Sequence, residues 1–282
     1  MKKAKIIILA GQSNAVGVGH VKYLSKHFKD EKVKEWLDGY PNIKINYFSH
    51  DKKSGGFVNT TVGCTEVSKY TVGPELGIAD ALDEKYPGEE FYIVKCAFGG
   101  TSLYRDWLPP ACDGYDAGSY ADQYEHMIRS LEAGMPIRAS WCYNELIKIT
   151  DESVKALEAE GLAPRIISFC WMQGEADGCD PAHTAAYAGR YDAMINGFKN
   201  AFPEYTVNCV FADAGISRVW PFYRELNEEK RKYAETHGNC VYIDTIEAKL
   251  TTENEPEEPD IYHYDSDCVI KLGHLFADTV RI

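Results

Sequence analysis

The 282-residue chain lacks any apolar run near the roughly 20 residues that a membrane-spanning helix needs. It also lacks an excess of positive charge, because 30 Lys and Arg stand against 43 Asp and Glu, for a formal net charge of −13. Nucleic-acid binders concentrate positive charge, and anionic membrane surfaces attract it. We therefore expect neither a nucleic acid nor a membrane as a partner.

The sequence also lacks a complete secretion signal. Lys2, Lys3 and Lys5 precede an apolar run, but that run, Ile6–Ala10, has five residues and is shorter than the ~7–15 of a signal-peptide core. The run is better explained as a buried first strand. We expect a cytoplasmic protein, or a secreted one if a signal has been removed.

Spacings typical of metal sites and redox motifs are absent. The nine cysteines are scattered, odd in number, and never spaced C-x-x-C. This pattern indicates neither a zinc site nor a disulfide framework. We expect free thiols that act as small core residues in a reducing compartment, and no metal.

The early glycines do not form a nucleotide-binding loop. In GQSNAVGVGH, the spacing from Gly11 to Gly17 is one residue too long for a Walker loop, and no lysine follows. The dinucleotide fingerprint G-x-G-x-x-G also fails, because Lys22 stands where its third glycine belongs. No nucleotide cofactor is expected.

What the sequence does contain is an alternation of apolar, strand-like runs with helical patterns. The expected strands are 5–10, 43–48, 90–97, 165–171, 206–213 and 240–244, and the expected helices are 21–38, 74–86, 141–160, 182–201, 221–237 and 266–280. Near-continuous apolar strands that alternate with helices indicate an α/β fold, with a parallel sheet covered on both faces. The length suits one such domain over residues 1–282.

Ligands of such folds bind beyond the carboxyl ends of strands, so the residues that follow the strands are the candidates for chemistry. Ser13 follows the first strand and is either a nucleophile in need of a base or a helix N-cap. After the third strand, Gly99 and Gly100 offer bare backbone to a ligand, and after the fourth, Gln173 offers an amide. A tight turn and a helix N-terminus explain these two loops equally well.

A base for Ser13 has to come from one of the eight histidines, and His263 is the best candidate. Asp260 precedes it by three residues, so in a turn the two side chains lie side by side. The carboxylate would then hold the imidazole toward a serine. A solvated turn with an incidental histidine is the alternative, and His274, inside the last expected helix, is the weaker candidate.

Together these motifs resemble the SGNH (GDSL-like) hydrolase superfamily. Within it they are similar to the branch of sialate O-acetylesterases and acetyl xylan esterases, carbohydrate esterase family six. The matching stretches come in the family's order: 11–14 with Gly17, 73–75, 99–103, 171–177, and Asp260-x-x-His263. The resemblance implies a three-layer α/β/α fold with a flavodoxin-like parallel sheet.

The resemblance also implies roles for single residues. Ser13 matches the nucleophile, His263 the general base, and Asp260 the acid that orients it. The backbone amides of Ser13 and Gly100 match oxyanion donors, with Gln173 as a third. Further supporting or substrate-binding candidates are Gln12, Asn14, Gly99, Glu175, Arg105 and Trp107. Among these, Glu175 is implied either to pair with the histidine or to brace the site.

The implied activity is removal of O-acetyl groups from carbohydrates through an acyl-enzyme, without metal or cofactor. Xylan-type oligosaccharides and sialic acids both remain open as substrates. Arg105 could meet a carboxylate and Trp107 a sugar ring, although packing of the loop explains both equally well. A non-catalytic carbohydrate-binding protein and a general short-chain ester hydrolase are the alternatives. Asp265 and Asp267 add acid near the base, which departs from the family, and the region 108–139 carries no recognisable motif.

Overall fold

The computed structural model describes residues 1–64, 70–110, 140–253, 255 and 260–282, so the region 108–139 lies outside the described residues from 111 onward. Six of its strands form a parallel sheet: β1 (Lys3–Gly11), β3 (Tyr40–Ser49), β7 (Phe91–Ala97), β8 (Ala163–Met172), β9 (Val210–Ala214) and β10 (Cys240–Ile243). Their order is β10-β9-β8-β1-β7-β3. The short strands β4 (Lys52–Lys53) and β5 (Val58–Thr60) pair with β3 in the antiparallel sense. All six expected strands are therefore confirmed, although β9 begins later than predicted.

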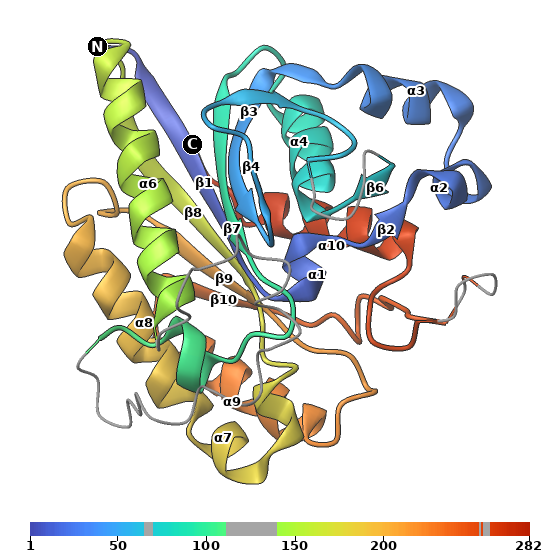
Figure 1. Cartoon of the computed structure of the whole chain (residues 1–282), viewed down its shortest axis with the longest axis vertical. Helices are drawn as coiled ribbons and strands as arrows, with labels where there is room; N and C mark the ends of the chain where they lie inside the picture. Colours follow the sequence, from blue (N-terminus) through green and yellow to red (C-terminus); the bar gives the residue numbers. More distant parts are fainter. Residues whose placement is uncertain (65–69, 111–139, 254, 256–259) are drawn as a thin grey trace.

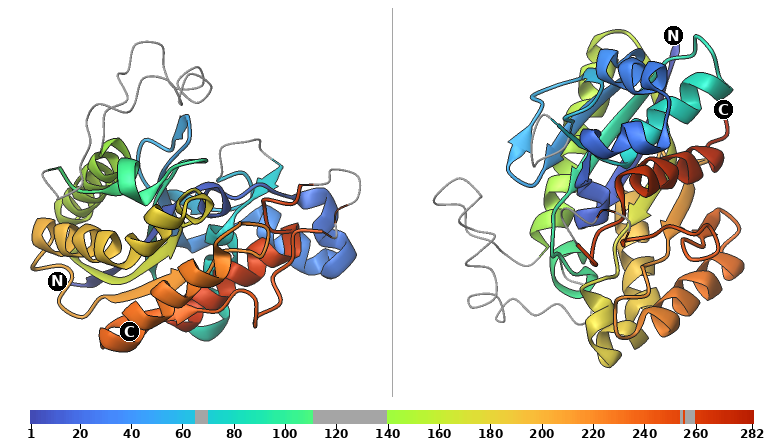
Figure 2. Two further views of the ribbon diagram at one scale, coloured as in Figure 1. Left: turned by 90° about the horizontal axis from the view of Figure 1, so that it is seen from below. Right: turned by 90° about the vertical axis from the view of Figure 1, so that its right-hand side faces the viewer.

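Helices cover both faces of this sheet (Figures 1 and 2). One face carries α6 (Trp141–Ala159) and α8 (Tyr187–Ala201). The other carries α4 (Pro74–Lys85) and α10 (Ser266–Asp278), which pack closely where two glycines, Gly77 and Gly273, face each other. The expected three-layer α/β/α architecture is confirmed. In the described part of the chain, no helix is both long and apolar enough to cross a bilayer.

Each of two expected helices is divided into two shorter helices. The range 21–38 forms α2 (Val21–His27) and α3 (Asp30–Asp38), and 182–201 forms α7 (Pro181–Ala185) ahead of α8. The first break falls at Phe28, whose backbone is extended and whose ring packs edge-on against Trp36 at 4.8 Å between centroids. A helical pattern in the sequence does not reveal this packing, so the prediction of one continuous helix was wrong.

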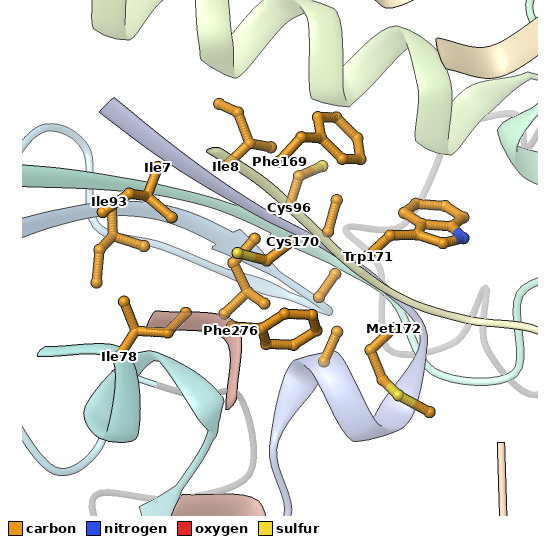
Figure 3. Packing of buried hydrophobic residues seen from close by; sticks show 14 of the residues in the cluster. Ile7, Ile8, Ile78, Ile93, Cys96, Phe169, Cys170, Trp171, Met172 and Phe276 are labelled. Atoms are coloured by element: carbon orange, nitrogen blue, oxygen red, sulfur yellow. The ribbon is translucent and has the colours of Figure 1, made fainter. Parts of the chain in front are cut away.

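The core lies between the sheet and both helical layers. Figure 3 shows Phe169 and Trp171 of β8 on the side of α6, and Met172 and Phe276 on the opposite side. Alternate residues of the strands thus serve both faces, which explains the near-continuous apolar runs. All eight cysteines in the described ranges are free and six are buried, as expected, but Cys179 is exposed. The ninth, Cys112, lies outside the described residues.

A buried carboxylate joins the helices of one layer. Asp80 of α4 is 2% exposed, and it accepts hydrogen bonds from Lys32 at 2.7 Å, Tyr40 at 2.7 Å and His274 at 2.8 Å. Burial alone would raise the pKa of Asp80, but the hydrogen bonds from His274, Lys32 and Tyr40 outweigh it and hold the pKa well below its usual value. A carboxyl group with a lowered folded-state pKa stabilises the fold above its unfolded-state pKa. That contribution is lost as the pH falls through the folded-state value.

We expect Asp80→Asn to lower the free energy of unfolding at pH 7 by about 3 kcal/mol, because it removes one partner of a buried ionic network. The gap between wild type and variant should shrink below about pH 4, where the wild-type carboxylate also loses its advantage. Urea titrations at pH 7 and pH 3 measure both effects, with Asp278→Asn at the exposed end of α10 as the control. A gap of equal size at both pH values would contradict a role for the charge.

Candidate active site

β1 and β8 are neighbours in the sheet. The chain connections that leave their carboxyl ends run to opposite sides of the sheet. After β1 the chain moves to β3 on one side of the sheet, and after β8 it moves to β9 on the other. Connections that diverge from neighbouring parallel strands leave a crevice at their carboxyl ends. The polar loops predicted from the sequence after β1 and β8 both begin at this crevice, and the loop after β7 lies beside them.

Ser13 opens the short helix α1 (Ser13–Val16), directly after β1. Gly11 makes the turn possible, because its φ is +141° and a Cβ there would stand 1.9 Å from the carbonyl oxygen of Met172. The Gln12 amide donates to that same carbonyl at 2.9 Å, and the buried Gln12 side chain accepts from the amide of Ala176 at 3.2 Å. The turn is therefore fastened to the end of β8. Ser13 itself is partly exposed, and its hydroxyl has no hydrogen-bond partner among the described residues.

Asp260 and His263 form a pair in the loop before α10. The Nδ1 atom of His263 lies 2.5 Å from Oδ2 of Asp260, and the two side chains are 24% and 45% exposed. Partial burial would raise the pKa of Asp260, but the hydrogen bonds from His263 and from the Tyr262 amide hold it below its usual value. Asp260 is thus an ionised partner that fixes the ring orientation. The second ring nitrogen of His263 has no hydrogen bond within the described ranges.

Asn14 connects the turn at Ser13 to the loop of His263. Its Oδ1 accepts from the Tyr264 amide at 3.0 Å, and its Nδ2 donates to the Tyr262 carbonyl at 3.4 Å. Both chain neighbours of His263 are therefore bound to the residue next to Ser13. The sequence predicted only a general supporting role for Asn14, because these partners are distant along the chain.

Glu175 supports Asn14, which connects the turn at Ser13 to the loop of His263. Its Oε1 accepts from Nδ2 of Asn14 at 2.9 Å, and the residue is fully buried. Burial raises the pKa of Glu175, and the hydrogen bond from Asn14 and the charges of Lys230 and His263 oppose this shift only in part. Of the two roles implied by the resemblance, the geometry supports bracing, because the hydrogen bond of Glu175 goes to Asn14.

The glycines after β7 lie beside the serine. A Cβ built on Gly99 would stand 3.8 Å from Cβ of Ser13, so no side chain separates the two segments. Gly100 follows with a φ of +69° and is exposed. A left-handed conformation of this kind favours glycine. The loop therefore brings bare backbone to the side of the crevice where Ser13 lies.

Gln173 occupies an interior position between two loops. Its Nε2 lies 2.7 Å from Oδ2 of Asp177 and 3.2 Å from the Thr101 carbonyl, while its Oε1 accepts from Tyr187. The side chain is fully buried. Oε1 of Gln12 also lies 3.4 Å from this nitrogen, so three acceptors surround an amide group that carries two hydrogens, and both hydrogens are engaged. Gln173 here joins the loops that follow β7 and β8, and donation to a ligand would require one of these bonds to open.

Trp107 and Arg105 lie in a π-helical turn, η1 (Leu103–Trp107), and both are buried. The Trp107 ring is fully buried, its Nε1 donates to Thr101 at 2.9 Å, and it packs edge-on against Trp171. Of the two explanations that the sequence left open for Trp107, this burial favours packing of the loop over contact with a sugar. Arg105 is 7% exposed and lies 3.5 Å from Asp106, which favours the packing explanation for it too.

A buried lysine, not predicted from the sequence, holds the far end of α1. Lys95 lies within β7 and is fully buried, and its Nζ contacts Oε2 of Glu75 at 2.7 Å and the Val16 carbonyl at 2.6 Å. The signal was present in the sequence, because a lysine inside the apolar strand FYIVKCA needs a buried partner. Glu75 belongs to one of the motifs that carried the resemblance.

A second buried lysine holds the loop after β8. Lys230 comes from α9 (Tyr223–Thr236), and its Nζ lies 2.7 Å from Oδ1 of Asp213 and 2.5 Å from the Gln173 carbonyl. Burial raises the pKa of Asp213 to about 6 even though Lys230 lowers it. The loops that begin after β1 and β8 are thus each anchored by an ammonium group beneath the crevice.

In this three-layer fold a serine follows the first parallel strand, and an Asp–His pair is bound to the same turn, as the sequence motifs predicted. The chain belongs to the carbohydrate esterase family of sialic acid-specific acetylesterases, whose family model matches residues 3–281. It is therefore a carbohydrate acetylesterase, as the sequence motifs implied.

Several solved structures share the fold. NanS has a TM-score of 0.67 at 18% identity, over 98% of this chain and 96% of that chain. A protein from Arabidopsis thaliana has a TM-score of 0.62 at 19% identity, over 98% and 97%. A carbohydrate acetylesterase from Xanthomonas citri has a TM-score of 0.59 at 14% identity, over 98% and 55%. At these identities the likeness concerns the fold alone. Comparison with curated protein sequences gives no match.

Proposed function

We propose that the chain is a serine esterase that removes O-acetyl groups from carbohydrates by way of an acyl-enzyme. The observation that carries this proposal is the bond pattern of Asn14, which fastens both neighbours of His263 to the turn of Ser13. A nucleophile and a base that come from opposite ends of the chain are thereby kept at one crevice. The hydrogen bond from His263 to Asp260 then leaves the other ring nitrogen available for the serine.

In the proposed reaction, the Ser13 hydroxyl attacks the acetyl carbonyl carbon while His263 takes its proton. The oxyanion accepts hydrogen bonds from the backbone amides of Ser13 and Gly100. His263 then gives its proton to the departing sugar oxygen, which leaves acetate esterified to Ser13. Water, deprotonated by His263, hydrolyses this ester and restores the enzyme. Gln173 serves as a third oxyanion donor if substrate binding frees one amide hydrogen from Thr101.

The resting geometry is compatible with this sequence of steps. The Ser13 hydroxyl and the free ring nitrogen of His263 have no hydrogen-bond partner among the described residues, so neither is engaged elsewhere. Catalytic hydrogen bonds are often long in unliganded enzymes and tighten in the complex with substrate. We therefore expect the serine–histidine bond to close when substrate excludes water from the crevice.

Among acetylated carbohydrates we propose O-acetylated sialic acids as the preferred substrates, with acetylated xylan-type oligosaccharides second. The family to which the chain belongs supports this order, because its description specifies sialic acid. We also propose that residues 1–282 act as one domain, since the serine and its base come from its two ends.

Two measurements on the same preparation test the proposal. Acetate release is followed with an O-acetylated sialic acid, an acetylated xylo-oligosaccharide and a series of p-nitrophenyl esters. In parallel, a fluorophosphonate labels the activated serine, and peptide mass spectrometry locates the adduct. We expect fastest acetate release from the sialic acid and an adduct on Ser13. A purely carbohydrate-binding protein would give neither, and faster cleavage of several short-chain p-nitrophenyl esters than of either acetylated sugar would indicate a general short-chain ester hydrolase.

A further inference from the structure

A pocket opens at the same edge of the sheet as the crevice of Ser13, beyond the ends of β9 and β10. It has a volume of about 460 Å³, and its walls are residues 217–219, which follow β9, residues 246 and 249–253, which follow β10, and Ile261. We call it the β9–β10 pocket. Ile261 lies between Asp260 and His263 in the chain, so the pocket adjoins the loop that carries the proposed base. This edge is where ligands of parallel sheets bind.

Two cationic side chains line the β9–β10 pocket in a chain whose net charge is −13. Neither Arg218 nor Lys249 forms a side-chain hydrogen bond or an ion pair with any described residue. Glu253 is the one acid among the described lining residues. Lys249 also has a φ of +59°, a conformation that disfavours a residue with a side chain and that is often retained at functional sites.

A buried hydroxyl without a partner lines the same pocket. Ser217 is 8% exposed, and its Oγ makes no hydrogen bond within the described part of the chain. A buried polar group without a partner is unfavourable, so a rotation of the Ser217 side chain that lets Oγ bond to a ligand hydroxyl or carboxylate would gain free energy. Thr252 adds a second hydroxyl. Leu250 and Ile261 add apolar surface, and Ile261 is 49% exposed.

We propose that the β9–β10 pocket is a subsite for a carboxylate-bearing sugar unit that neighbours the acetylated unit of the substrate. A guanidinium binds a carboxylate through two parallel hydrogen bonds, and the ammonium of Lys249 adds a second positive charge. The hydroxyls of Ser217 and Thr252 suit sugar hydroxyls, and the apolar side chains suit the C–H face of a pyranose ring. The inference rests on the proposed function, because it concerns where the rest of the substrate of that esterase lies.

The proposal predicts a preference for acidic oligosaccharides that depends on two named side chains. Two acetylated oligosaccharides are compared that differ only in whether the unit next to the acetylated sugar carries a carboxylate or a hydroxymethyl group. We expect the wild type to have a kcat/KM at least ten-fold higher for the acidic one. Arg218→Gln and Lys249→Gln should each raise KM for the acidic oligosaccharide several-fold, and the double variant should bring the ratio of the two kcat/KM values close to one.

Arg224→Gln is the matched control, because Arg224 is exposed on α9, lies outside the pocket, and its loss changes the net charge equally. It should leave the ratio at the wild-type value. Loss of the preference in this control would indicate long-range attraction of anions by the whole protein, and would overturn the subsite. A wild type without any preference, or Arg218 and Lys249 variants that retain it, would overturn it as well.

A binding measurement separates this inference from the esterase mechanism. Calorimetric titration of the Ser13→Ala protein with the deacetylated acidic oligosaccharide requires no turnover. Binding that weakens about ten-fold when Arg218→Gln is added supports the subsite even if Ser13 proves not to be the nucleophile. Equal binding with and without Arg218 would contradict the subsite even if Ser13 does carry the chemistry.

Discussion

Ser13→Ala is expected to abolish acetate release, with kcat lower by roughly 10³–10⁶-fold. The hydroxyl is the atom proposed to attack the acetyl carbon, and members of such a catalytic unit act together, so the remaining groups cannot compensate. Because the hydroxyl makes no hydrogen bond with a described residue, its removal should leave the unfolding midpoint unchanged. Acetate release and thermal unfolding on the same preparation measure both effects.

Ser25→Ala is the control, since Ser25 is an exposed serine of α2 and should be replaceable without effect. A Ser13→Ala protein with wild-type acetate release would remove Ser13 from the mechanism and, with it, the proposed acyl-enzyme. The same conclusion would follow if the fluorophosphonate adduct formed equally well on the variant.

The second large effect is expected for His263→Ala, which removes the proposed base and should lower kcat by roughly 10³-fold or more. Asp260 would then keep its charge but have no ring to orient. Added imidazole should restore part of the activity, because a small base can enter the space left by the ring. Acetate release with and without imidazole measures this rescue.

His274→Ala separates the two histidine candidates. The His274 ring is bound to Asp80, so its loss should reduce stability while kcat of the folded protein stays near wild type. If His274→Ala lost turnover at unchanged stability while His263→Ala retained it, the base would be His274. Asp260→Asn should resemble His263→Ala in direction, since an amide in place of the carboxylate would misorient the ring.

Much of the fold could be predicted because each central strand is apolar on both faces and each is followed by a helical pattern. The break at Phe28 could not, since it depends on where Trp36 packs after the chain has folded. The burial of Trp107 was left open for a related reason. A tryptophan that follows a glycine-rich loop fits a sugar platform or a core anchor equally well, and only the turn of η1 decides between them.

In the site, too, the sequence indicates local features but not the contacts between segments that lie far apart along the chain. Ser13 and the Asp260–His263 pair were predicted because they stand in recognisable local settings, a strand end and a short turn. The polar contacts that support them were not, because each joins segments far apart along the chain. Lys95 is a partial exception. A lysine within an apolar strand indicates a buried partner, but the sequence does not identify that partner as Glu75.

The bond between Asn14 and Tyr264 spans 250 positions of the chain. Contacts between such distant segments close long loops, and the entropy of closure delays them during folding. A chain whose first strands have formed therefore already presents Ser13, but the proposed base, His263, reaches the same crevice only when the last loop docks. We expect hydrolytic activity to appear only in the fully folded state, so partly folded molecules would not hydrolyse esters.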